Sequence, residues 1–263
     1  MSSPALTRLA GSENITPRHG GRIAVNLRPT KSSASQHNTH LSHGARRISV
    51  SHGHLEALLK EPDRTIRGGA VICHPHPLHG GTMHTKAVYR AAQGLNDAGL
   101  VTLRFNFRGV GGSTGSHDSG IGEQDDLRAA IDWLESAYPH VPLVVGGFSF
   151  GSIVGLSVGA GDERVVSLLG LGLPVDLDDR YDYGFMANSA KPILIVQGEN
   201  DEFGPGEKVA SLISPLGNHI TLVRIPGTDH YFDSRLGELR TAVRGYYETG
   251  PGAKLLALSL IHI

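Results

Sequence analysis

The pentapeptide Gly147-Phe-Ser-Phe-Gly151 places a serine between two glycines, each two positions away from it. It follows the apolar run Pro142-Leu-Val-Val-Gly146 and precedes a helical stretch, 152–159. A nucleophile on a sharp strand-to-helix turn needs small residues at these two positions, because its backbone is strained and a neighbouring Cβ would clash. We therefore predict that Ser149 is a nucleophile at a helix N-terminus, where free N–H groups favour developing negative charge. A glycine-rich turn with an incidental serine is the alternative.

A serine hydroxyl is a weak nucleophile until a base removes its proton, so a histidine and a carboxylate must accompany it. His230 and Asp201 each follow a strand that we expect later in the chain. We predict His230 as the general base and Asp201 as the acid that orients it, which gives the chain order Ser, Asp, His. Glu202 is the nearest rival for the acid. Asp229 should diverge from His230 and cap a turn.

The segment His74-Pro-His-Pro-Leu-His-Gly-Gly81 follows an apolar strand, 69–73, where a strand–turn–helix architecture supplies half of an oxyanion hole. We assign the two donors to the backbone N–H groups of His76 and Phe150, the latter directly after the nucleophile. The prolines cannot donate, but they stiffen the loop. The three histidines of this segment, with His84, could instead suggest a metal site. We expect no metal, because no thiolate or paired carboxylate is near and the prolines restrict convergence of the rings.

A glycine-rich turn, Arg104-Phe-Asn-Phe-Arg-Gly-Val-Gly-Gly-Ser113, leaves the next expected strand. It lacks the third glycine of a dinucleotide-binding loop, and the sequence contains no Walker lysine. We therefore expect no cofactor. We interpret the turn as a tight crossover loop with Arg108 in a buried polar network.

Strand and helix signals alternate along the chain from Arg47 onward. The expected strands span 48–50, 55–59, 69–73, 101–105, 143–147, 165–171, 192–197 and 220–225. The expected helices span 86–98, 123–137, a stretch from Gly151, 206–213 and 236–247. This order predicts an α/β fold, a mostly parallel central sheet with an antiparallel N-terminal hairpin and helices on both faces. Ligands on such sheets bind at the C-terminal strand ends, where every motif above falls.

Composition limits the class of protein. The 263 residues carry a formal net charge of −1, which gives no global field to attract nucleic acid or an anionic membrane. The single cysteine, Cys73, excludes an intramolecular disulfide, and no stretch approaches the roughly 20 apolar residues that cross a bilayer. We expect a cytoplasmic protein with one catalytic domain, residues 46–250, and no nucleic-acid or membrane partner. The oligomeric state stays open.

Both ends of the chain depart from the regular pattern. Residues 1–45 are rich in Ser, His, Asn, Gly and Arg and contain one acidic residue, Glu13. We expect them to be disordered or to result from a start codon assigned too far upstream, with an organellar transit peptide as the alternative. Residues 258–263 match the translated end of a transposon used for sequencing libraries, so we interpret them as an adapter artefact. A short apolar strand or helix end is the alternative.

Five motifs together resemble a family of small bacterial α/β-hydrolases, serine hydrolases distantly similar to dienelactone hydrolases. The motifs are Cys73-His-Pro-His-Pro77, Arg104-Phe-Asn-Phe-Arg-Gly-Val-Gly111, Gly147-Phe-Ser-Phe-Gly151, Gly198-Glu-Asn-Asp201 and Asp229-His-Tyr-Phe232. The resemblance runs from about Arg47 to Tyr247 and implies the α/β-hydrolase fold and an esterase or acyl hydrolase. Dienelactone hydrolases have a cysteine nucleophile where this chain has Ser149, so their substrate is not carried over.

These features predict a serine hydrolase that cleaves carboxylic esters, or thioesters, through a covalent acyl-enzyme. Ser149 attacks the carbonyl carbon, His230 transfers the proton, and water releases the acyl group. Acyl transfer or peptide hydrolysis on the same triad is one alternative, and a non-catalytic binding scaffold is another.

The substrate should be a small-molecule ester with a small or short-chain acyl group. Lids of this fold are built mostly from insertions between the strand after the nucleophile helix and the next one, here between Leu171 and Pro192. That interval is short and its stretch 176–183 is rich in aspartate, so we expect a minimal lid or none. Substrate-binding residues stay unassigned, although Tyr181, Tyr183, Phe185 and Met186 could line one wall of a shallow pocket or simply pack a connecting helix.

Overall fold

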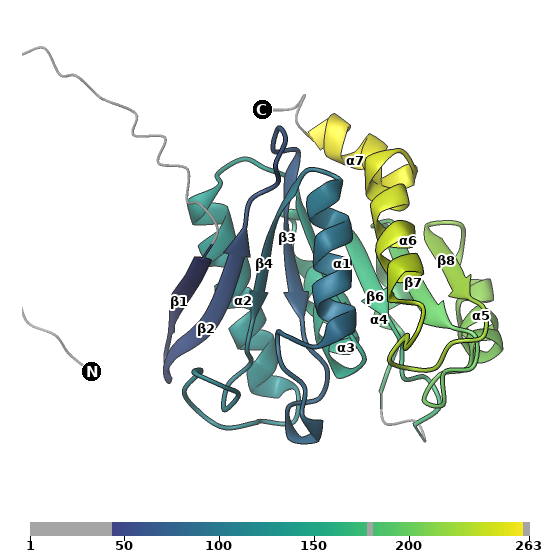
Figure 1. Ribbon diagram of the computed structural model, residues 1–263, viewed down its shortest axis with the longest axis horizontal. Helices are drawn as coiled ribbons and strands as arrows, with labels where there is room; N and C mark the ends of the chain where they lie inside the picture. Colours follow the sequence, from purple (N-terminus) through teal and green to yellow (C-terminus); the bar gives the residue numbers. More distant parts are fainter. Residues whose placement is uncertain (1–43, 178–180, 260–263) are drawn as a thin grey trace, which may run out of the picture. The chain divides into compact units, whose positions relative to one another are not determined.

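The computed structural model describes residues 44–177 and 181–259, which form an eight-stranded sheet with helices on both faces (Figure 1). The strands are β1 (Gly44–Val50), β2 (Gly53–Lys60), β3 (Gly68–Cys73), β4 (Leu100–Phe105), β5 (Leu143–Phe148), β6 (Val165–Leu171), β7 (Ile193–Gly198) and β8 (Ile220–Ile225). The helices are α1 (Lys86–Asp97), α2 (Ile121–Ala137), α3 (Phe150–Gly161), α4 (Phe185–Asn188), α5 (Gly206–Ile213), α6 (Leu236–Glu248) and α7 (Pro251–Ser259), with short 3₁₀ turns η1 (Pro77–His79) and η2 (Ser214–Leu216).

The sheet has the strand order β1-β2-β4-β3-β5-β6-β7-β8. The pairs β1–β2 and β2–β4 are antiparallel, and every other neighbouring pair is parallel. The predicted mostly parallel sheet with an antiparallel N-terminal hairpin is therefore confirmed. The chain leaves β3 toward β4 on one side and later returns as β5 on the other, so a topological switch point lies between the C-terminal ends of β3 and β5.

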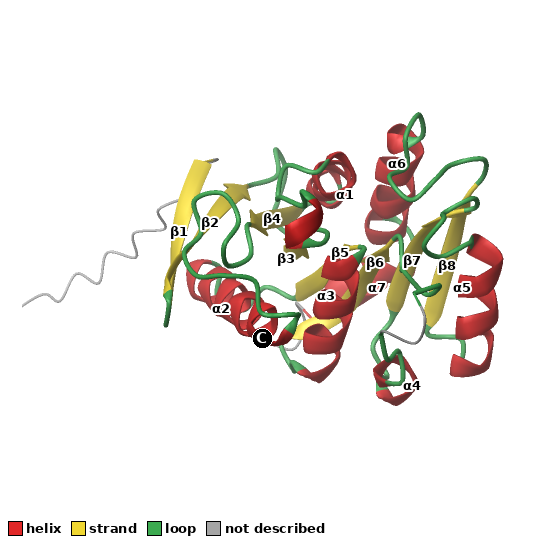
Figure 2. Cartoon of the chain, turned by 90° about the horizontal axis from the view of Figure 1, so that it is seen from below, coloured by secondary structure: helices red, strands yellow, loops and turns green. Residues whose placement is uncertain are grey.

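Two hydrophobic layers enclose the sheet, because successive strand side chains point to opposite faces. Ala70 and Ile72 of β3 join the layer formed by α1, α6 and α7, while Val71 and Cys73 join the layer formed by α2, α3 and α5. Figure 2 shows the sheet between α1 and α6 on one side and α2 and α3 on the other. Strands buried on both faces read as continuous apolar runs, which is why β3 to β7 were predicted nearly to the residue.

The first strand extends further than its apolar residues indicate. β1 begins at Gly44, four positions before the predicted start at Ile48, because Gly44 to Val50 all pair with β2 across the hairpin. Ile48 is the one buried residue of β1, because an edge strand packs against the core on few positions. The sequence of β1 therefore carries little apolar signal. Gly44 and Ala45 thus belong to the sheet, while the expectation for residues 1–43 falls outside the described residues.

The C-terminal helix α7 was not predicted. The Gly-Pro-Gly sequence at 250–252 suggests a chain break, yet Pro251 occupies the first helical position, where its missing N–H costs nothing. Leu256 is fully buried in the layer with α1 and α6. Leu258 and Ser259, the first residues of the stretch that we interpreted as an adapter artefact, lie in α7, and residues 260–263 fall outside the described residues.

Between β6 and β7 the described residues contain one helix, the four-residue α4. This agrees with the expected absence of a substantial lid. In the described ranges, no helix has the length and apolar character required to cross a membrane.

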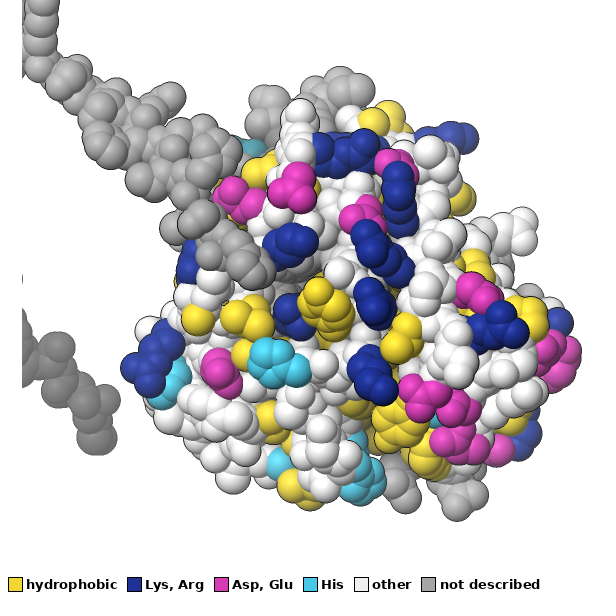
Figure 3. Space-filling view, in the orientation of Figure 1, with side chains coloured by type: hydrophobic (Ala, Val, Ile, Leu, Met, Phe, Trp, Pro, Cys, Tyr) yellow, Lys and Arg dark blue, Asp and Glu magenta, His cyan; other side chains and the backbone are white. Residues whose placement is uncertain are grey.

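The surface over α1 and α6 carries a row of Lys and Arg side chains, dark blue in Figure 3. Acidic residues neutralise much of it: Arg240 binds Asp97 at 2.6 Å, and Arg244 and Arg64 bind Glu248 at 2.6 and 2.7 Å. The row is therefore a set of ion pairs on exposed helix faces, and each pair adds little to stability.

Candidate active site

Ser149 forms the sharp turn between β5 and α3. Its backbone has φ 54° and ψ −123°, a conformation that residues with a Cβ rarely adopt. Hydrogen bonds of its backbone hold it there: the Ser149 N–H donates to Leu171 O at 2.9 Å, and Ser149 O accepts from the Ser152 hydroxyl at 2.6 Å, the Ser152 N–H at 2.8 Å and the Ile153 N–H at 3.4 Å. The strain is thus maintained by neighbouring elements, as at sites where function requires it.

The flanking glycines permit the close approach of this turn to its neighbours. A Cβ on Gly147 would lie 2.3 Å from Gly151 O, and a Cβ on Gly151 would lie 2.3 Å from His74 O. Both distances are far inside contact with backbone atoms that cannot move aside, so no other residue fits at either position.

His230 follows β8 and forms a hydrogen bond with the acid predicted for it. Its Nδ1 lies 2.8 Å from Oδ2 of Asp201, and the two side chains are 3% and 0% exposed. The rival Glu202 instead accepts the His230 backbone N–H at 3.1 Å. Asp229 accepts the Asp233 N–H at 3.1 Å and so caps a turn, as predicted.

The carboxylate of Asp201 is held by donors from its own loop and strand. Oδ1 accepts the N–H groups of Phe203 at 2.8 Å and Gly204 at 3.1 Å, and Oδ2 accepts from Gln197 Nε2 at 2.8 Å. These donors hold the carboxylate in place, and its oxygen as the acceptor on Nδ1 fixes the histidine tautomer that leaves Nε2 free to accept a proton.

Gln197 is a site residue that the sequence analysis missed. It is fully buried in β7, where its amide donates to Asp201 and Gly204 O and accepts the Leu173 N–H at 2.8 Å. It therefore joins the loop that carries Asp201 to the loop after β6. A glutamine that ends the run Ile-Leu-Ile-Val was the available signal, because a polar side chain in a buried strand needs partners.

A cavity of about 150 Å³ lies between Ser149 and His230, the predicted nucleophile and base. Ser149 and His230 both line it, along with His76, Phe203 and Leu177. The His230 ring packs against Phe148 at 4.8 Å and Phe203 at 4.7 Å between ring centroids, which restricts its rotation. The cavity lies at the C-terminal strand ends, where the topology places ligands.

The loop after β3 supplies His76 to this cavity, and Phe150 begins α3, where the first N–H groups lack intrahelical partners. The Ser149 N–H is used by Leu171, so the donor on the α3 side comes from Phe150 onward. The His76 and Phe150 rings lie 5.0 Å apart. The two predicted oxyanion-hole residues are thus neighbours beside Ser149.

Buried His74 fixes the peptide that carries the His76 N–H. Its Nε2 accepts from the Phe107 N–H at 3.0 Å, so its Nδ1 carries the proton and donates to Pro75 O at 2.6 Å. Burial lowers the pKa of His74 to about 4, which keeps the ring neutral. In a trans peptide the C=O and N–H point in opposite directions, so a bonded Pro75 carbonyl sets the direction of the His76 N–H.

His74 and Cys73, which lie against Gly151, are poorly placed for metal binding or nucleophilic attack. Both ring nitrogens of His74 are occupied by backbone groups, which removes it from the metal ligands considered above. No group of three or more potential ligands is arranged to hold a metal within residues 44–177 and 181–259. Burial raises the pKa of the Cys73 thiol, which makes it a poor nucleophile.

Arg108 lies in the buried polar network that we predicted. Its Nε and terminal nitrogen donate to the carboxylate of Asp126 at 3.1 and 2.8 Å, and the Asp126 side chain is fully buried. These hydrogen bonds raise the pKa of Arg108. The network joins the crossover loop to α2.

The model of the alpha/beta hydrolase domain family matches residues 71–244, and the chain belongs to that family. It is 37% identical to an uncharacterized protein of Rickettsia prowazekii (strain Madrid E) over 186 residues, which cover 68% of this chain and 78% of the relative. An alpha-beta serine hydrolase homologue from Coxiella burnetii superposes with a TM-score of 0.72 at 36% identity, over 78% of this chain and 97% of the other.

XC6422 from Xanthomonas campestris, described as an a/b serine hydrolase without lid, superposes with a TM-score of 0.71 at 35% identity, over 78% of this chain and 93% of the other. Family and neighbours together support a hydrolase. The sequence resemblance to the α/β-hydrolase superfamily is confirmed.

Proposed function

We propose that the chain is a serine esterase in which Ser149 is the nucleophile, His230 the general base and Asp201 the acid. The observation that carries this proposal is the buried pair of His230 Nδ1 and Asp201 Oδ2 at 2.8 Å, in a site where Ser149 occupies a strained turn. A buried histidine with its tautomer set by a carboxylate is what activation of a serine requires.

In the proposed reaction, His230 Nε2 takes the hydroxyl proton of Ser149 as Oγ attacks the ester carbonyl carbon. The N–H groups of His76 and Phe150 stabilise the oxyanion, and the helix N-terminus adds to this field. His230 then gives the proton to the leaving alcohol, and an acyl-enzyme remains. Water, deprotonated by His230, attacks the acyl carbon and releases the acid and free Ser149.

The acyl group should be small. A cavity of about 150 Å³ beside Ser149 is comparable to one that holds a single benzene molecule, so a long chain would extend beyond it. Each additional methylene adds about 0.8 kcal/mol only while it becomes buried. We therefore expect kcat/KM to flatten or fall beyond a few acyl carbons.

The alternatives receive less support. Acyl transfer or peptide hydrolysis would use the same residues, but no additional feature of the described site favours an amine acceptor or a peptide groove. The strained backbone of Ser149 costs about 1–3 kcal/mol of stability. A binding scaffold that performs no reaction would have no reason to keep it.

A series of p-nitrophenyl esters from acetate to palmitate tests the proposal. Wild-type enzyme should hydrolyse the short esters best, and Ser149→Ala should lower kcat by about four orders of magnitude without a change in melting temperature. Near-wild-type activity of Ser149→Ala would reject the assignment. A steady rise of kcat/KM toward palmitate would reject the short-chain preference.

A further inference from the structure

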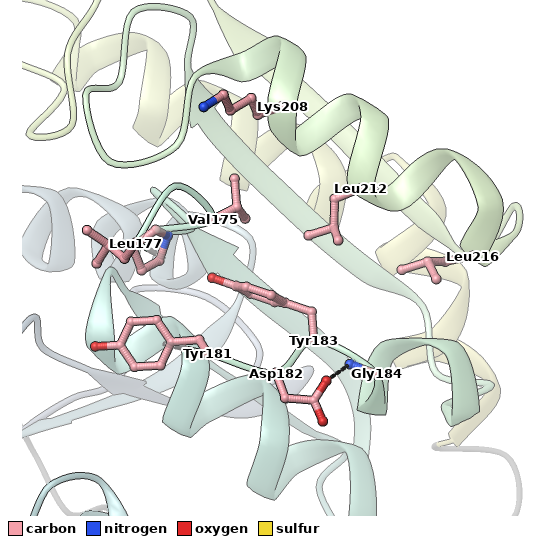
Figure 4. Close-up of a pocket in the computed structure, with 10 residues that line it drawn as sticks. Val175, Leu177, Tyr181, Asp182, Tyr183, Gly184, Lys208, Leu212 and Leu216 are labelled. Atoms are coloured by element: carbon pink, nitrogen blue, oxygen red, sulfur yellow. Dashed lines mark hydrogen bonds between the residues drawn. The ribbon is translucent and has the colours of Figure 1, made fainter. Parts of the chain in front are cut away.

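A second and larger cavity opens beside the active site. It has a volume of about 480 Å³, within the range of small-molecule sites and well above that of the Ser149 cavity. Figure 4 shows its two walls: the loop after β6 on one side, and α5 with η2 on the other. The side chains that carry the following argument are Val175, Leu177, Tyr181, Tyr183, Leu212 and Leu216.

The two cavities meet at Leu177, which lines both. The adjacent residue, Asp176, donates its N–H to Phe203 O at 2.8 Å, and the Phe203 ring packs edge-on against His230 at 4.7 Å. The segment that separates the cavities, Asp176 and Leu177, is therefore held against Phe203, which contacts His230. The larger cavity thus adjoins the Ser149 cavity at Leu177, whose neighbour Asp176 is bonded to the residue that packs against His230.

The larger cavity favours an uncharged ligand. Aliphatic side chains and two tyrosine rings form most of its lining. Lys208 at its rim is already paired with Asp176 at 2.5 Å, and the carboxylate of Asp182 accepts the Gly184 N–H at 2.7 Å. Among the described residues of this rim no cation is left unpaired to compensate an anion, so a carboxylate or phosphate would be repelled by the Asp182 carboxylate.

The hydroxyl of Tyr183 in the cavity wall is a buried polar group whose position packing alone does not explain. The residue is 9% exposed, and its hydroxyl is buried without a hydrogen-bond partner among the described residues. Figure 4 shows this hydroxyl pointing toward Val175 and Leu177, where the two cavities meet. Folded proteins rarely leave a buried hydroxyl unpaired, and such groups occur where a ligand completes the site.

We propose that this cavity is the subsite for the alcohol part of the ester, and that it takes an uncharged aryl or bulky alkyl group. The proposal rests on the proposed esterase function. His230 must protonate the leaving oxygen, so the alcohol departs on the His230 side, toward Leu177 and the larger cavity. The acyl group then occupies the smaller cavity around Ser149 and His76.

Acetate esters that differ only in the alcohol test the subsite. The indole of Leu212→Trp would fill the cavity from α5. The variant should lower kcat/KM for benzyl acetate about tenfold and leave the value for methyl acetate within about twofold of wild type. Ser211→Trp places the same indole on the exposed side of α5, outside the lining, and should change neither value. The rate with methyl acetate also reports that each variant is folded.

Two results would overturn the subsite. One is an unchanged ratio of benzyl to methyl acetate in both Leu212→Trp and Leu216→Trp. The other is a loss of kcat/KM confined to methyl phenylacetate, which would place the acyl group in the larger cavity.

A binding experiment tests the subsite without turnover. Saturation-transfer NMR should detect benzyl alcohol bound to Ser149→Ala, and the signal should disappear when Leu212→Trp is added to that variant. Absence of all ester hydrolysis in the wild type would instead reject the proposed function.

Discussion

Two adjacent carboxylates, Asp201 and Glu202, contact different parts of His230. Asp201 binds the ring, while Glu202 accepts the backbone N–H. Asp201→Asn should lower kcat by at least about a hundredfold, because an amide can stabilise neither the imidazolium nor the required tautomer. Glu202→Gln keeps an acceptor for the His230 backbone N–H, and its kcat should stay within a few-fold of the wild-type value. Steady-state kinetics on a short ester measure both values of kcat. A larger loss of kcat in Glu202→Gln than in Asp201→Asn would assign the role of the acid to Glu202.

His74 offers a test of the oxyanion peptide, because its two ring nitrogens bind different partners. His74→Asn retains a donor near Nδ1 for Pro75 O, whereas His74→Gln retains an acceptor near Nε2 for the Phe107 N–H. If the Pro75 bond positions the His76 N–H, His74→Gln should lose about tenfold in kcat with little change in KM, and His74→Asn should lose less. Equal losses, or the reverse order, would show that His74 serves stability only.

Helix α7 has no clear sequence signal, and substitutions of two of its leucines measure how much its packing contributes to stability. Leu256→Ala removes a fully buried side chain from the layer with α1 and α6, and should lower the free energy of unfolding by about 2–5 kcal/mol. Leu258→Ala, two residues further on, removes a side chain that is 56% exposed and should change it by less than about 0.5 kcal/mol. Urea denaturation measures both. Equal effects would mean that α7 does not pack as described.

The elements that the sequence predicted well are those with strong local signals. β3 to β7 are apolar on both faces, and the motif around Ser149 needs only its own glycines to define a turn. α7 was missed because one buried leucine, set by the distant surface of α1 and α6, decides its packing. The lining of the larger cavity was only partly foreseen: Tyr181 and Tyr183 were considered, but Leu212 and Leu216 come from a segment whose position depends on the tertiary fold.

The stability of the whole domain should depend on the protonation of His74. Its pKa is about 4 in the folded protein and near 6.5 in an unfolded chain, so between these values the unfolded state binds more protons. Stability from this residue is fully present above about pH 6.5 and falls as the pH is lowered toward 4, by about 3 kcal/mol. His74→Asn should show a flatter pH dependence in denaturant titrations. An identical slope in wild type and variant would contradict the neutral buried histidine.

The distribution of chemistry over the molecule follows from its topology. Ser149, Asp201 and His230 follow β5, β7 and β8, so the parallel sheet gathers residues from distant parts of the chain at one edge. The same edge holds both cavities. The proposed subsite therefore predicts that substitutions at Leu212, Val175 or Leu177 change the substrate preference without altering the three residues proposed to perform the reaction.

Covalent labelling tests the central claim most directly. Wild-type protein treated with a fluorophosphonate should gain one adduct by intact mass, and peptide mapping should place it on Ser149. His230→Ala should label far more slowly, because the hydroxyl loses its base, and Ser149→Ala should not label at all. An unlabelled wild type, or an adduct that persists in Ser149→Ala, would contradict the account.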